Sequence, residues 1–77
     1  MNNLTLRDSV VGKNYEVVKI NGKGPLKRRI MDMGITKGAQ VYIRKVAPLG
    51  DPVQINLRNY ELSIRREDAE LIVIKEI

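Results

Sequence analysis

The sequence predicts a mostly β fold: a small, partly open barrel of five short strands with one inserted α-helix and short helical turns. Apolar and polar residues alternate with a period of two along several short segments, as they do in half-buried strands. Turn-forming residues separate these segments, so the connections between strands are tight. The 77 residues leave room for one hydrophobic core, and we expect a single domain over residues 1–77.

Five segments are expected to form the strands because each is rich in β-branched or alternating apolar residues. They span residues 16–20, 41–44, 53–57, 60–64 and 71–77. Two short helical turns flank this set. Thr5 to Asp8 has the spacing of a capping box, with Asp in place of the usual Glu. Arg66 to Ala69 fits a single helical turn that points Ala69 inward before the last strand.

Two connections carry recognisable turn residues. Arg58 and Asn59 join two strands, and Asn59 can take the left-handed conformation that a two-residue hairpin needs. Leu49 to Pro52 separates the strand before it from the next one, because Gly50 supplies unusual dihedral angles and Pro52 cannot join a ladder of hydrogen bonds.

One α-helix is expected between the first two strands. Pro25 suits the first position of a helix, and Leu26, Ile30 and Met33 then recur along one face. Gly34 follows directly, where a left-handed C-cap belongs.

The alternation also predicts the core. Tyr60 shares the spacing of the core-facing set. The other inward residues, with three helix residues packed over them, are expected to be Val41, Ile43, Val53, Ile55, Leu57, Leu62, Ile64, Ile72, Ile74, Leu26, Ile30 and Met33. An SH3-like barrel fits this strand count, and an OB-fold is the competing architecture. Since an OB-fold places its helix after the third strand, the early helix favours the SH3-like barrel.

The composition excludes several kinds of chemistry. Cysteine and histidine are both absent, which removes disulfides, thiolate zinc sites, Cys nucleophiles and His-based triads. Residues 21–25 lack the spacing of a phosphate-binding loop, and the carboxylates of residues 67–70 are expected to serve solubility and capping. We therefore expect no enzyme. We also expect no required cofactor and at most weak ferrous iron binding, because Fe(II) usually recruits imidazole or thiolate ligands.

Charge leaves the class of partner open. The chain has 14 Lys and Arg against 9 Asp and Glu, a net charge of +5, which suits acidic partners or simple solubility. Lys27, Arg28 and Arg29 fan around the helix, either as a solvated face or as a partner contact, and Arg29 can pair with Asp32. No nucleic acid is expected, because single-strand binders stack bases on aromatic side chains and only three Tyr are present.

No targeting signal is recognisable. The first residues lack the basic and apolar regions of a signal peptide, and the longest purely aliphatic stretch is residues 71–74. We expect a cytoplasmic protein.

Leu49 is the one apolar residue in a turn whose other members shape the backbone. Between Pro48 and Pro52 it would form either a rigid, exposed knob for a partner or a lid on the open end of the barrel.

Three segments, taken together, resemble the FeoA-type ferrous iron transport proteins. Residues 27–38 resemble that family's R-R-L-x-D-M-G-[IL]-x-x-G segment. Residues 47–52 match its A-P-L-G-D-P turn, and residues 60–69 resemble its Y-E-L-[SA]-L-R-x-x-E-A stretch. The matches occur in the same order and cover nearly the whole chain. Ile30 replaces a usual Leu, and Asn59 replaces a common Gly.

The resemblance implies an SH3-like barrel with a cytoplasmic accessory role in Fe(II) uptake. Its implied partner is the membrane transporter FeoB, which carries a cytoplasmic G-protein domain, and the family is associated with transition-metal binding. On this basis we expect a monomer or weak oligomer that reaches the inner membrane through the transporter. The alternative is a small regulatory or nucleic-acid-binding barrel in a metal-response pathway. The residues expected at the partner interface are Leu49, Pro48, Gly50, Asp51, Pro52, Lys27, Arg28 and Arg29.

Overall fold

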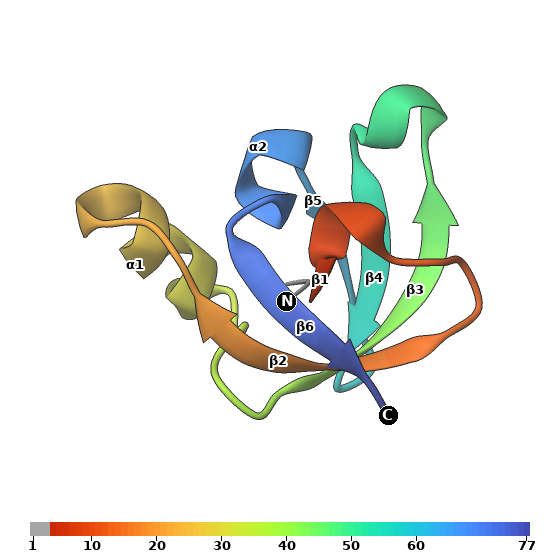
Figure 1. The fold of residues 1–77 in the computed structure, drawn as a ribbon, viewed down its shortest axis with the longest axis horizontal. Coiled ribbons are helices and arrows are strands. Elements are labelled where there is room, and N and C mark those ends of the chain that lie inside the picture. The colour runs from red at the N-terminus through yellow and green to blue at the C-terminus, as the bar shows by residue number, and fades with distance from the viewer. Residues whose placement is uncertain (1–3) are drawn as a thin grey trace.

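A single antiparallel sheet of six strands curls around the core in the computed structural model, which describes residues 4–77 (Figure 1). The strands lie side by side in the order β1-β6-β2-β3-β4-β5. They are β1 (Leu4–Thr5), β2 (Asn14–Ile20), β3 (Gln40–Val46), β4 (Val53–Leu57), β5 (Tyr60–Ile64) and β6 (Ile72–Glu76). Two 3₁₀ helices, η1 (Leu6–Asp8) and η2 (Pro48–Gly50), and two α-helices, α1 (Gly24–Asp32) and α2 (Arg66–Ala69), lie in the connections between them.

The five predicted strands are all present, and β1 is an addition to them. This strand has two residues, too few to show any period in the sequence. It pairs with β6, with Leu4 opposite Ile74. Within residues 4–77 the two edge strands, β1 and β5, do not pair with each other, so the sheet remains open along one line. The expected partly open barrel is confirmed.

Two irregularities in the ladders curl the sheet. The register between β2 and β6 shifts between Val17 and Lys19, and the register between β3 and β4 shifts between Ile43 and Lys45. An extra residue in one strand bends that strand and increases its twist. Both shifts lie in the long central strands, where bending brings the two ends of the sheet round the core.

The predicted Arg58–Asn59 hairpin turn and the predicted caps of η1 and α1 are confirmed. Arg58 and Asn59 both have positive φ, at 51° and 71°, which is the backbone of a two-residue hairpin of the primed type. Helix α1 has Pro25 in its first turn and is followed by Gly34 at φ 93°. The Asp8 carboxylate of η1 accepts hydrogen bonds from the Thr5 N–H (3.2 Å) and from Thr5 Oγ1 (3.1 Å).

The core is continuous and almost wholly aliphatic. Its predicted members Leu62 and Met33 are only partly buried at its margin. The residues that are buried as expected are Ile30, Val41, Ile43, Val53, Ile55, Leu57, Ile64, Ile72 and Ile74. Those that sequence periodicity did not assign are Leu6, Tyr15, Val17, Ile35, Ala39 and Val73, and Ala69 is buried as the helical turn predicted.

Two core assignments were wrong. Tyr60 is 71% exposed although it lies opposite the buried Leu57, because it begins β5, which within residues 4–77 is an edge strand with no neighbour on its outer side. Leu26 is partly exposed and does not belong to the core cluster. It lies in the first turn of α1, and Ile30 is the residue by which this helix enters the core.

Candidate partner-binding surfaces

The turn of residues 47–52, here called the Leu49 turn, projects from the end of the β3–β4 hairpin. Leu49 is 87% exposed, the largest exposure among the large apolar side chains of residues 4–77. The alternative in which Leu49 folds back as a lid on the barrel is therefore wrong. The side chain stands in solvent, where its burial would have to come from another molecule.

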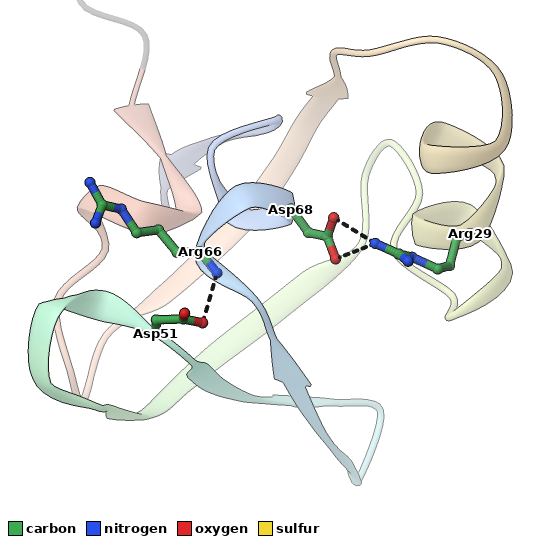
Figure 2. A network of polar contacts seen from close by, with 4 residues as sticks. All are labelled: Arg29, Asp51, Arg66 and Asp68. Carbon is green, nitrogen blue, oxygen red and sulfur yellow. Dashed lines mark hydrogen bonds and ion pairs between the residues drawn. The ribbon is translucent and has the colours of Figure 1, made fainter.

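The base of this turn is fixed to the barrel. The Ala47 N–H donates to the Pro52 carbonyl oxygen at 3.0 Å, which closes the loop across the turn. Asp51 Oδ1 accepts a hydrogen bond from the Arg66 N–H at 3.3 Å, as Figure 2 shows, and this bond ties the turn to the start of α2. Pro48 and Pro52 further restrict the backbone. The turn therefore presents Leu49 with little conformational freedom left to lose on binding.

The Leu49 backbone is itself unusual. Its φ of 66° and ψ of 12° lie in the left-handed region, which glycine enters without penalty and which costs other residues about 1–2 kcal/mol. A large apolar side chain is thus both strained in its backbone and exposed to water. Neither property contributes to folding stability, and strain of this kind is commonly retained at functional sites.

The basic residues of α1 divide into two groups. Lys27 and Arg28 are exposed and form no ion pair with any residue of 4–77. Arg29 instead donates from Nη2 to both carboxylate oxygens of Asp68, at 2.9 and 3.0 Å (Figure 2). The predicted pairing of Arg29 with Asp32 is therefore wrong.

Asp68 corrects a second expectation. It is 4% exposed, so it does not serve solubility as the other carboxylates of residues 67–70 were expected to do. The turn that buries Ala69 also carries Asp68 inward, and a buried carboxylate is stable only when it is paired. Its place beside a predicted buried Ala was the available signal in the sequence. The Arg29–Asp68 ion pair joins α1 to α2.

The predicted interface residues form two separate surfaces. The Leu49 turn contains five of them, and α1 contains Lys27, Arg28 and Arg29. Figure 1 shows α1 at one side of the barrel and the η2 turn at the opposite upper corner, with the sheet between them. One small contact patch cannot include both surfaces. Any common partner would have to reach across the barrel.

The three tyrosines do not form a row for stacking bases. Tyr15 is buried, and its hydroxyl oxygen accepts a hydrogen bond from the Val10 N–H at 3.0 Å. Tyr42 lies across from Asn56, which in turn lies across from Glu61. Since side chains alternate along a strand, Tyr60 points to the other face of the sheet from Tyr42. The exposed rings therefore lie on different faces.

Within residues 4–77 no three Asp or Glu side chains gather closely enough to hold a metal ion. In the same part of the chain, no helix has the length and apolar character needed to cross a membrane. The expectation of at most weak iron binding stays a prediction.

Comparison with known proteins places the chain in a family. The FeoA domain family matches residues 4–76. A Fe(2+) transport protein A/Fe(2+) transporter FeoB fusion protein from Porphyromonas gingivalis is 34% identical over 74 residues. That match covers 96% of this chain but 9% of the fusion protein, so the chain corresponds to a small part of it.

Solved structures agree with the fold. The FeoA-like protein from Clostridium acetobutylicum superposes with a TM-score of 0.88 at 35% identity, covering 100% of this chain and 91% of that protein. FeoA of Stenotrophomonas maltophilia, complexed with zinc and described as a procaryotic SH3 domain protein, gives a TM-score of 0.80 at 20% identity over 94% of this chain and 89% of that one. At that identity the likeness concerns the fold alone, and it confirms the SH3-like barrel. The match over residues 4–76 shows that the chain belongs to the FeoA domain family.

Proposed function

We propose that this protein is a cytoplasmic, non-enzymatic accessory protein of ferrous iron uptake that acts by binding a FeoB-type membrane transporter. Membership of the FeoA domain family supports the link to iron transport. The relative in which an Fe(2+) transport protein A and FeoB form one chain supports the choice of partner. A barrel of this size cannot carry an ion across a bilayer, so its contribution has to come through contact with the transporter.

The observation that carries the contact is the exposed, left-handed Leu49. Complete burial of a leucine side chain in an apolar pocket of the transporter would contribute about 1.5–3 kcal/mol. The hydrogen bonds at the base of the turn hold its backbone in place before binding. Little of this binding free energy is therefore lost to ordering the turn. Lys27 and Arg28 would attract an acidic region of the same partner from the far side of the barrel and increase the association rate.

The test is a binding measurement with the purified cytoplasmic G-protein region of the transporter. We expect Leu49→Ala to weaken binding by about tenfold, which corresponds to 1.4 kcal/mol. The unfolding free energy should change by less than about 1 kcal/mol, since the side chain makes few contacts. Val11→Ala is the matched control, because Val11 is also an exposed aliphatic residue in a loop, at 52% exposure.

Equal binding by Leu49→Ala and the parent chain would contradict the proposed contact. A gel shift with duplex and single-stranded DNA at physiological salt tests the alternative, a regulatory nucleic-acid-binding barrel. Binding to nucleic acid but not to the transporter region would overturn the proposed function.

A further inference from the structure

An open groove of about 330 Å³ lies between α1, the end of β2 and the loop that precedes β3. It is lined by Lys19, Ile20, Lys27, Met31, Thr36 and Lys37, and we call it the lysine groove. Neither the Leu49 turn nor the Arg29–Asp68 ion pair contributes to it.

The rim of the lysine groove is uniformly positive. Lys19, Lys27 and Lys37 are exposed, and none of them forms an ion pair within residues 4–77. No carboxylate lines the groove. Two lysines outside the groove do pair, Lys13 with Glu76 and Lys75 with Glu16. The three free amines therefore attract an anionic ligand with no competing charge from the groove itself.

The floor of the groove is apolar. Met31 is 44% exposed although it lies on the side of α1 that faces β2, and Ile20 is partly buried against the core. Methionine is flexible and polarisable, so it adapts to differently shaped apolar side chains. The alkyl stems of the lysines extend the apolar walls while their amines remain in water. The groove combines an apolar bottom with a cationic rim.

We propose that the lysine groove binds an acidic protein segment in which an apolar side chain is flanked by carboxylates. The apolar residue would contact Met31 and Ile20, and the carboxylates would pair with Lys19, Lys27 and Lys37. A concave site selects an inserted side chain over the flat surface of an anionic membrane. This site goes beyond the proposed transporter contact through Leu49. Because α1 and the Leu49 turn lie at opposite sides of the barrel (Figure 1), both surfaces can be occupied at once.

The experiment uses fluorescence anisotropy with a labelled peptide, Gly-Glu-Asp-Leu-Leu-Asp-Glu-Gly, and a second peptide in which both leucines are serine. The parent chain should bind the leucine peptide at least about fivefold more tightly, because the apolar floor is then used. Replacing Lys19, Lys27 and Lys37 together by Gln should weaken binding by about tenfold. The matched control replaces Lys23, Lys45 and Arg58 together by Gln and so removes the same charge. These three residues are exposed, form no ion pair within residues 4–77 and lie outside the groove.

Equal weakening by the two triple variants would overturn the proposal, because net charge alone would then explain binding. Equal affinity for the two peptides would also overturn it. So would binding to vesicles with a phosphatidylglycerol fraction by a chain that does not bind the leucine peptide. Met31→Ser is the independent variant: a loss of the preference for leucine over serine supports the groove, and a retained preference contradicts it. None of these measurements involves Leu49, so they fail or succeed separately from the transporter test.

Discussion

At one corner of the molecule an apolar side chain, Leu49, is 87% exposed, while between α1 and α2 a carboxylate, Asp68, is 4% exposed. Both depart from the usual partition of apolar and charged residues. The departure at Asp68 is resolved within the chain, because Arg29 approaches both of its oxygens at 2.9 and 3.0 Å. The departure at Leu49 is not resolved by any contact among residues 4–77. A buried charge that is paired within the chain, as Asp68 is, indicates a role in holding the fold together. An exposed apolar side chain that nothing in the chain covers, as with Leu49, indicates a binding partner.

The largest expected effect on stability is at the buried Asp68, whose charge is paired with Arg29. Arg29→Met keeps a long side chain but leaves the buried Asp68 carboxylate unpaired, and we expect the free energy of unfolding in urea to fall by about 2–3 kcal/mol. Arg28→Met, a neighbour on the same helix, should change it by less than about 0.5 kcal/mol. Adding Asp68→Leu to Arg29→Met should recover most of the loss. If Arg29→Met is as stable as the parent chain, the buried Asp68 carboxylate does not need Arg29 as its partner.

At the exposed Leu49 we expect a smaller change in stability, and of opposite sign. Leu49→Gly relieves the left-handed backbone, and we expect a net stabilisation of about 0.5–1 kcal/mol after the entropy cost of glycine. Leu49→Ala removes nearly the same side chain without relieving the backbone, so the difference between the two variants isolates the strain. Thermal unfolding of both variants measures it. A destabilised Leu49→Gly would mean that the leucine contributes to folding and that its exposure does not indicate a partner.

The exposed charges of α1, Lys27 and Arg28, should affect the rate of association with the transporter more than the stability of the fold. Lys27→Gln with Arg28→Gln is expected to slow association with the transporter region by a few-fold and to reduce its dependence on salt. Arg29 is left unchanged in this variant because it holds Asp68. Stopped-flow or biosensor kinetics at two salt concentrations provide the measurement. A change confined to the dissociation rate would place these residues inside a close contact rather than in a steering field.

The smallest expected effect is that of Fe(II) or Zn(II) on the unfolding temperature. Asp68 is occupied by Arg29, and oxygen ligands from the remaining carboxylates suit hard cations better than Fe(II). We expect Fe(II) or Zn(II) to bind no more tightly than about 1 µM, and to leave the unfolding temperature unchanged. Anaerobic titration calorimetry of the metal-free protein tests this. A saturable nanomolar site would contradict it and would show a ligand set that the side-chain chemistry did not predict.

Local patterns in the sequence were sufficient for most of the fold. The two-residue period located β4 and β5, and Asn59 marked the hairpin between them, because both signals depend on neighbours in the chain. Tyr60 was misplaced because alternation describes which face a residue points to and not whether its strand lies at the edge of the sheet. β1 was missed because two residues show no period.

The candidate surfaces were predicted less completely. The isolation of Leu49 in a turn, which is a local property, left an exposed knob and a lid as alternatives, and the structure shows the side chain exposed. The Arg29–Asp68 pair joins residues 39 positions apart, and the sequence offered Asp32 as a nearer partner for Arg29. The lysine groove brings together Lys19, Lys27 and Lys37 from three different segments. Such contacts depend on how elements pack, and no local spacing encodes them.

The open line between β1 and β5 has a consequence for the behaviour of the concentrated protein. The outer side of β5 offers backbone groups that another strand could pair with, and unprotected edges of this kind lead to fibrils. Charged residues on an edge strand oppose such pairing. Glu61 lies on β5 one residue from the hairpin and pairs with Arg44 of β3 at 3.2 Å, so this edge strand carries such an obstacle. Replacement of Glu61 by valine would remove this obstacle, and light scattering during storage would then rise. Charge on a free edge is thus a means by which an open sheet can resist edge-to-edge association.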